Sequence, residues 1–250
     1  YLNYNEPNAL KVVVKNGVPS GRWYTGGGIY RDVNLWTGKD VYISHDKLRI
    51  TTLSVNDDMA VIEVCAQLKN IIGHGLEAEC LIEIKKDGQK TASDSQRVVF
   101  RSEQMQTVRV QIPIEHPKKW SPKQPALYEC HITTKFDDKI CDEAVSNFGI
   151  RVLALDPVHG LQINGETVKL RGTCIHHDNG VIGAETFKEA EWYRCKRLKE
   201  AGFNAIRSAH HPMSRAMLDA CDHIGMLVMD ELTDMWDKEK NTYDLSLIHI

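Results

Sequence analysis

The hydrophobic pattern of this 250-residue chain changes its period once, near residue 156, which limits the chain to folds with two different halves. Before that point, apolar and polar residues alternate in short segments, as in VRVQI at 108–112. Such alternation is typical of half-buried strands. After it, short apolar segments are separated by longer ones with the three-to-four-residue spacing of helices. The chain is therefore predicted to combine an all-β part with an α/β part.

The first part contains about seven short strands separated by polar turns, such as KDG at 86–88 and DDK at 137–139. Their number and spacing predict an immunoglobulin-like β-sandwich over 41–154. Residues 1–40 carry a few further strands and a glycine cluster at 26–28, and we expect them to be the tail of another β-domain. The sandwich strands are predicted at 41–43, 48–55, 60–69, 79–85, 98–100, 107–114, 128–134 and 145–152.

In the second part, three short strands alternate with two helices, which predicts a parallel sheet or barrel. The strands are predicted at 168–170, 204–207 and 226–229, and the third is expected to be buried because it is wholly apolar. Gly202 fits the end of a helix over 185–201. Ser214 is predicted to cap the second helix, which ends at Gly225. The apolar face of the first helix is predicted to contain Phe187, Ala190, Leu198 and Ala201, with Cys195 at its margin. The charged Arg194 also falls on this face.

Polar side chains follow each of these three strands. They are His176, His177 and Asp178 after the first, Ser208, His210 and His211 after the second, and Asp230 and Glu231 after the third. Barrel enzymes build their active sites at the carboxyl ends of their strands, and open α/β sheets bind ligands there. The sequence therefore predicts one shared functional face.

Composition excludes several classes of protein. The net charge of −3 and the lack of a basic stripe argue against a nucleic-acid partner. No apolar run approaches the roughly 20 residues that span a bilayer, so we do not expect this chain to be an integral membrane protein. The seven cysteines are scattered and none forms a C-x-x-C pair, which disfavours a disulfide framework or a zinc ribbon. We expect them to be small buried hydrophobic residues.

Two chemistries are open for the polar face. Histidines and a carboxylate are typical metal ligands. They also exchange hydrogen bonds with a hydroxyl-rich ligand such as a sugar, on whose apolar face Trp236 could stack. Adjacent histidines on an extended chain point to opposite sides, so each pair is expected to offer one inward ring. We expect His177 and His211 to form hydrogen bonds with backbone groups at the ends of their strands.

Residues 204–229, NAIRSAHHPMSRAMLDACDHIGMLVM, closely resemble the signature of glycoside hydrolase family 2, which includes β-galactosidases, β-glucuronidases and β-mannosidases. The family's usual Tyr before the Pro is His211 here. VKLRG at 168–172 with His176 resembles the family's entry into its TIM barrel. WSP at 120–122 and PALY at 125–128 resemble its immunoglobulin-like domain. Trp23-Tyr24 and GIYRDV at 28–33 resemble the end of its N-terminal jelly roll.

The resemblance implies a retaining mechanism, in which one Glu is the acid/base and a second Glu is the nucleophile. In the family these follow the fourth and seventh strands, and no Asn-Glu pair in the barrel part of this chain fits. The resemblance carries over only sugar-binding groups: His176 and His210 in the pocket, Arg207 as a strand-end organiser or a salt bridge, and Glu231 as the strand-three carboxylate. The stretch at 232–237 does not match the family's magnesium ligands, so neither metal nor cofactor is predicted.

The chain is predicted to be a fragment of a β-galactosidase-like enzyme, inactive by itself, because about 90 residues do not complete a barrel. Its parts are 1–40 from the jelly roll, the sandwich at 41–154 and the start of the barrel at 155–244. LSLIHI at 245–250 is what CTG TCT CTT ATA CAC ATC encodes, a transposase sequencing-adapter sequence, so this tail is expected to be non-native. The alternatives are a non-catalytic carbohydrate-binding or scaffolding β-sandwich protein and a metal-dependent hydrolase.

Overall fold

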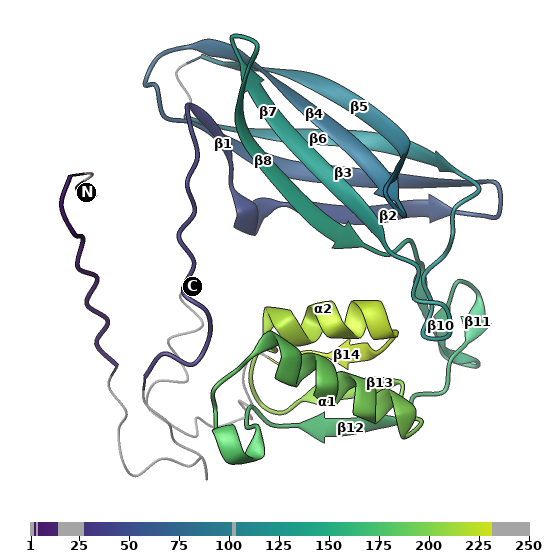
Figure 1. The fold of residues 1–250 in the computed structure, drawn as a ribbon. Coiled ribbons are helices and arrows are strands. Elements are labelled where there is room, and N and C mark those ends of the chain that lie inside the picture. Colours follow the sequence, from purple (N-terminus) through teal and green to yellow (C-terminus); the bar gives the residue numbers. More distant parts are fainter. Residues whose placement is uncertain (1–2, 4, 15–27, 102–103, 232–250) are drawn as a thin grey trace.

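The computed structural model describes residues 3, 5–14, 28–101 and 104–231. Trp23-Tyr24, Trp236, the stretch at 232–237 and the tail at 245–250 lie outside the described residues, as do two glycines of the cluster at 26–28. Most of the described chain forms a β-sandwich and a smaller α/β unit, which a short meander of strands connects (Figure 1).

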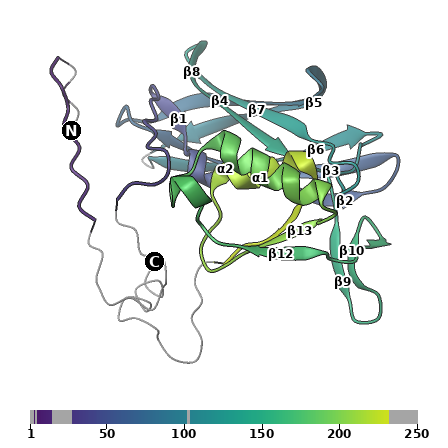
Figure 2. The same ribbon diagram turned by 60° about the horizontal axis from the view of Figure 1, so that its bottom comes forward.

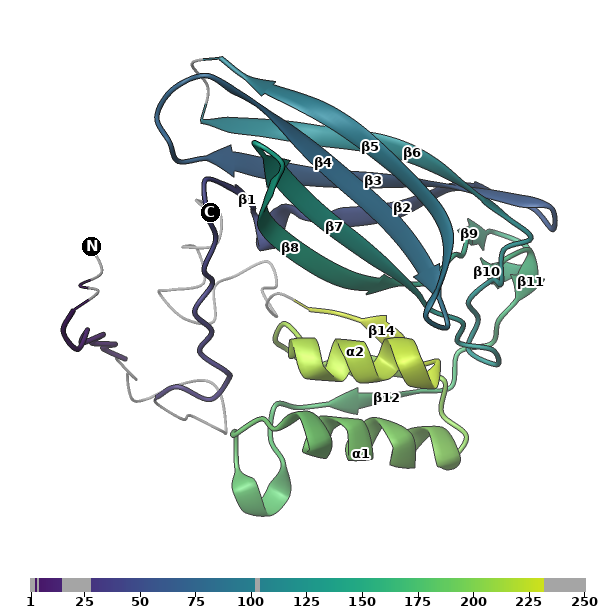
Figure 3. The ribbon, with the colours of Figure 1, turned by 45° about the horizontal axis from the view of Figure 1, so that its top comes forward.

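The sandwich consists of two antiparallel sheets of four strands each, which lie one over the other (Figure 3). In one sheet β3 pairs with β1 and β2 on one side and with β6 on the other. The second sheet has the order β5-β4-β7-β8. A 3-10 turn, η1 (His45–Lys47), separates the first two strands. The strands are β1 (Val41–Ile43), β2 (Arg49–Val55), β3 (Met59–Asn70), β4 (Leu76–Lys86), β5 (Gln89–Phe100), β6 (Met105–Glu115), β7 (Tyr128–Phe136) and β8 (Lys139–Phe148).

Alternation along the central strands builds the core of the sandwich. Every second residue of β3 from Ala60 to Leu68 is fully buried, and β4, β6 and β7 repeat this pattern. These side chains from both sheets form one buried cluster. The period-two pattern in the sequence therefore placed a strand at each of these positions, because each of them has one face on this core.

The predicted strand at 98–100 is only the end of the twelve-residue strand β5. Most of β5 is exposed at the edge of its sheet, where polar residues are tolerated and the apolar alternation is lost. The predicted strand at 145–152 was also wrong, because β8 begins at Lys139 and ends at Phe148. The tight turn at Asp137 and Asp138, both with positive φ, starts β8 early.

At 5–14 and 28–40, the described parts of the first forty residues, the structure has no strand, so the strands expected in 1–40 are absent from these two stretches. Their apolar side chains are largely exposed, for example Leu10 at 79% and Trp36 at 63%. A strand requires a hydrogen-bonded partner, and none of the described strands pairs with this segment.

The α/β unit contains three parallel strands in the order β12-β13-β14, connected by two helices. The helices pack against each other and against one face of the sheet through a shared buried cluster that includes Cys195, Ile206 and Met217 (Figure 2). The meander before the unit has the order β11-β10-β9. The elements are β9 (Leu153–Asp156), β10 (Gly160–Ile163), β11 (Glu166–Thr167), β12 (Gly172–Ile175), η2 (Gly180–Ile182), α1 (Lys188–Glu200), β13 (Ala205–Ser208), α2 (Arg215–Ile224) and β14 (Leu227–Met229).

Several details of this unit differ from the sequence prediction. The first strand lies at Gly172–Ile175 and not at 168–170, because the Val168 N–H bonds the Leu161 carbonyl (2.8 Å) and extends the meander. The apolar third strand is not buried, and Met229 is 61% exposed, because the helices cover only one face of the sheet. The other face borders an apolar cavity of about 550 Å³, whose walls include Leu161 and Leu170.

The caps of α2 agree with the sequence prediction. Ser214 Oγ accepts the Met217 N–H (3.1 Å), and Gly225 ends the helix with φ 82°. A Cβ at Gly225 would lie 2.5 Å from the Pro122 carbonyl oxygen, so this glycine also permits close contact with the sandwich side. Lys199 Nζ donates to the same Pro122 carbonyl (2.7 Å), which links α1 to that contact.

All seven cysteines are free, and five of them are buried, as their predicted role as small hydrophobic residues requires. Cys174 is exposed and Cys65 is half-buried. No helix among the described residues is long and apolar enough to cross a membrane.

Candidate functional site

The four residues that the sequence predicted to bind sugar lie together at the carboxyl ends of the three parallel strands. His176 directly follows β12, Arg207 lies near the end of β13 with His210 just after it, and Glu231 follows β14. Parallel strands in register bring these positions to one edge of the sheet, because Cys174 pairs with Arg207 and Arg207 pairs with Met229.

Glu231 is the centre of this cluster. Its Oε1 accepts a hydrogen bond from Arg207 Nε, and its Oε2 bonds His210 Nδ1 at 2.8 Å. Partial burial by itself raises the pKa of Glu231, but the hydrogen bonds and charges of Arg207 and His210 outweigh it and lower that pKa overall. The same hydrogen bond raises the pKa of Arg207. Glu231 is therefore an ionised carboxylate that fixes both neighbours.

In each pair of neighbouring histidines, His176-His177 and His210-His211, the two rings point to opposite sides, as expected for adjacent residues on an extended chain. The rings of His176 and His210 meet edge to face with centroids 6.2 Å apart. The rings of His177 and His211 form a second pair at 5.1 Å. His176 and His210 therefore belong to the Glu231 cluster, whereas His177 and His211 belong to a separate packed layer.

His177 is buried in that second layer. Its Nε2 lies 3.0 Å from Thr186 Oγ1, and its ring meets the Tyr30 ring edge to face at 4.8 Å. Burial, followed by the nearby charges of His211, Arg31 and Arg194, lowers the pKa of His177 to about 4. Burial also lowers the pKa of His211. His177 is neutral at physiological pH and acts as a structural group.

Because the pKa of His177 falls from 6.5 when unfolded to about 4 when folded, acid destabilises the native state through this ring. The unfolded chain binds the extra proton between pH 6.5 and 4, so its contribution is complete above pH 6.5 and declines towards pH 4. Between pH 6.5 and 4, the free energy of unfolding of the wild type should fall by about 1.4 kcal/mol per pH unit through this ring, and we expect His177→Gln to abolish that part of the slope. Urea unfolding of both proteins from pH 8 to pH 4 measures it, and the values at pH 8 isolate any lost packing. Equal slopes below pH 6.5 would contradict the assignment.

Arg194 holds the loop that carries His176 and His177. Its guanidinium donates to the carbonyls of His176 (3.2 Å) and Asp178 (2.8 Å) and to the side chain of Asn179. Glu191, one turn earlier on α1, is 1% exposed, and burial raises its pKa. The predicted apolar face of α1 was right at Leu198, which packs against the buried cluster of the unit, but wrong at Phe187, which is 47% exposed. Glu191, which was not predicted on that face, is buried together with Cys195.

The N-terminal segment also reaches this region, and no local sequence pattern predicted it. Arg31 Nη2 donates to the Pro212 carbonyl (2.5 Å), and the Tyr30 carbonyl accepts the Thr186 N–H (3.2 Å). These contacts join a segment before the sandwich to the loops after β12 and β13. Only the resemblance of GIYRDV at 28–33 to a known motif drew attention to the two residues.

The cluster is suited to recognising hydroxyl groups. Within the part of the chain that the structure describes, no three His, Cys, Asp or Glu side chains come together as a metal site. Asp230 Oδ1 accepts the Met213 N–H (2.8 Å), and both oxygens of Glu231 are already bonded. The adjacent Asp230 and Glu231 are thus occupied in organising loops, whereas the imidazole of His210 has a second ring nitrogen that can exchange a hydrogen bond with a ligand.

Two family models match the chain. The model described as glycosyl hydrolases family 2 matches residues 41–151, and the model of that family's TIM barrel domain matches residues 158–238. The β-galactosidase BoGH2A of Bacteroides ovatus is 33% identical over 98% of this chain and 29% of its own length. A β-glucuronidase of Bacteroides fragilis is 28% identical over 92% of the chain and 35% of its own length.

A solved structure resembles this one closely. The crystal structure of a glycosyl hydrolase family 2 member from Bacteroides cellulosilyticus superposes with a TM-score of 0.84 at 35% identity, over 92% of this chain and 30% of that one. The present chain therefore spans about a third or less of the length of the relatives that it matches.

Proposed function

Because the chain belongs to glycosyl hydrolase family 2, we propose that it is part of a longer enzyme that hydrolyses β-linked glycosides with retention of configuration. The observation that supports this most is the cluster of His176, Arg207, His210 and Glu231 at the carboxyl ends of three parallel strands. TIM-barrel enzymes place their active sites at this end of their strands.

In this proposal, each part of the chain has a role in a family 2 enzyme. Residues 41–154 form the immunoglobulin-like domain, and residues 155–244 form the first three βα units of the catalytic barrel. Residues 1–40 are the end of a jelly-roll domain. The exposed apolar face of β12–β14 and the adjoining cavity of about 550 Å³ fit the interior of a barrel that further strands complete.

The proposed mechanism uses two glutamates from the longer protein, with carboxyl groups ~5–5.5 Å apart. Residues of this chain bind and orient the sugar. Because His210 Nδ1 is bonded to Glu231, its Nε2 remains to accept a sugar hydroxyl in the neutral tautomer. Glu231 and Arg207 are positioning residues that hold His210 and the strand ends, and His176 contributes the facing ring.

The substrate that we propose is a β-galactoside. The ionised carboxylate of Glu231 offsets the charge of the Arg207 guanidinium, so this pair offers no net positive charge to a sugar carboxylate. A uronic acid requires such a cation, whereas a neutral galactosyl unit requires only hydrogen bonds. This favours galactosides over glucuronides, although relatives named for both substrates match the chain.

Nitrophenol release from nitrophenyl β-galactoside tests this proposal. We expect hydrolysis by the longer protein, no hydrolysis of the α-galactoside, and no activity of purified residues 1–250. A chelator should leave the rate unchanged, which separates this mechanism from a metal-dependent hydrolase. Activity of residues 1–250, or a longer protein inactive on every aryl β-glycoside, would overturn the proposal.

A further inference from the structure

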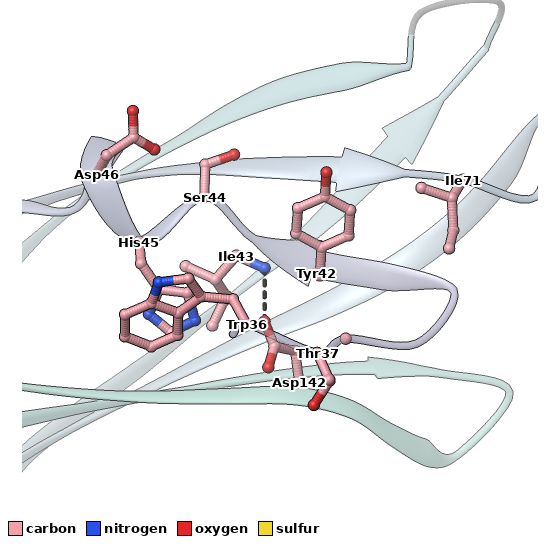
Figure 4. A pocket seen from close by; sticks show the side chains of 10 residues that line it. Trp36, Thr37, Tyr42, Ile43, Ser44, His45, Asp46, Ile71 and Asp142 are labelled. Carbon is pink, nitrogen blue, oxygen red and sulfur yellow. Dashed lines mark hydrogen bonds between the residues drawn. The ribbon is translucent and has the colours of Figure 1, made fainter. Parts of the chain in front are cut away.

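A second cavity, of about 570 Å³, lies in the sandwich beside β1 and not in the α/β unit that carries the Glu231 cluster (Figure 4). Its walls come from the segment before β1, from β1 and η1, and from β8. Its volume falls in the range of ~300–1,000 Å³ that is typical of small-molecule sites. The residues that matter for its chemistry are Trp36, Tyr42, Ser44, His45 and Asp142.

Trp36 forms an aromatic platform at this cavity. Its indole stacks on the His45 ring with centroids 4.0 Å apart and an interplanar angle of 26°, yet 63% of the residue is exposed. A single exposed tryptophan is ordinary on a protein surface. Trp36 differs because one face of its indole stacks on His45, which orients the ring, while most of the residue stays exposed.

Asp142 supplies fixed polar groups in the same cavity. Its Oδ2 accepts the Ile43 N–H (2.8 Å) and its Oδ1 accepts the Glu143 N–H (2.9 Å). A carboxylate oxygen has two lone pairs, so each oxygen can accept one more hydrogen bond. Ser44 and Tyr42 are also among the residues that line this cavity, and a hydroxyl group can both donate and accept.

An oriented aromatic ring beside hydrogen-bonding groups matches a pyranose, which has an apolar face and a rim of hydroxyls. Asp142 and the nearby Asp46 give the cavity carboxylates, which repel a sugar acid. We propose that this cavity is a second sugar-binding site, specific for a neutral hexosyl unit. It lies apart from the proposed active site, and it rests on the proposed function only for the choice of galactose-based probes.

The test is binding of β-1,4-galactotetraose to residues 1–250, measured by calorimetry and by the NMR signal of the Trp36 indole N–H. We expect this signal to shift and Trp36→Ala to weaken binding at least tenfold. Trp192→Ala is the matched control, because Trp192 is also partly exposed near a histidine ring (5.6 Å from His223) but lines none of the cavities described. It should change the affinity by less than twofold. Trigalacturonic acid should not shift the Trp36 signal.

Three results would overturn the proposal: no binding of the tetrasaccharide, equal binding by Trp36→Ala and wild type, or tighter binding of the acidic trisaccharide at Trp36. The assay requires no turnover. Failure of the proposed hydrolase function would instead appear in the nitrophenol assay of the longer protein, so the two failures are distinguishable.

Discussion

Trp120→Ala is expected to lower the free energy of unfolding by about 3–5 kcal/mol, which is the cost of truncating a large buried aromatic residue. Trp120 is 2% exposed and lies where the sandwich meets the α/β unit. Its indole N–H donates to the Asp222 carbonyl near the end of α2 (2.8 Å). Arg151 lies over the ring, 4.5 Å from its centroid, and Gly149 leaves no room for a side chain beside it.

Urea unfolding of residues 1–250 measures this effect, with Trp192→Ala as the control. Trp192 is 39% exposed, so its truncation should cost less than about 1 kcal/mol. Trp120→Phe separates the two contributions, because it keeps much of the packing and loses the hydrogen bond to Asp222. A Trp120→Ala protein within 0.5 kcal/mol of wild type, about the effect of an ordinary surface substitution, would contradict the role of Trp120 as an anchor between the two parts.

The sequence predicted the sandwich best where burial alternates most strictly. Strands such as β3 and β6 were located to within two residues, because each alternates between the core and solvent. The strand β5 was not, since its polar residues carry no such alternation. The first strand of the α/β unit was predicted at 168–170 and lies at Gly172–Ile175, because the Val168 N–H bonds the Leu161 carbonyl of the meander. Local periodicity does not contain this contact.

The candidate site was predictable as a set of strand ends. Parallel strands bring their carboxyl ends to one edge, so His176, His210 and Glu231 were correctly expected to lie together. The residues that support the site were not predictable, because their contacts join distant segments. Arg194 was placed on an apolar helix face, although it bonds the loop after β12. Tyr30 contacts His177 from a segment about 150 residues earlier in the chain.

Glu231→Ala in the longer protein is expected to lower kcat/KM for nitrophenyl β-galactoside about 100-fold or more. Glu231 is the hydrogen-bond partner of both Arg207 Nε and His210 Nδ1, so its loss releases the sugar-binding ring of His210 and the positioning residue Arg207. Small displacements of groups that position a substrate cost about 100-fold in rate. Glu231→Gln keeps one acceptor oxygen and should recover part of the loss.

The kcat/KM of Glu231→Ala tests the central claim that this cluster is part of a glycosidase active site. Glu200→Ala is the matched control, because Glu200 forms an exposed pair with Arg197 on α1 (3.0 Å) away from the strand ends. We predict a loss of about 100-fold for Glu231→Ala, less than twofold for Glu200→Ala, and a folded protein in both cases. A folded Glu231→Ala enzyme with wild-type kcat/KM would contradict the account.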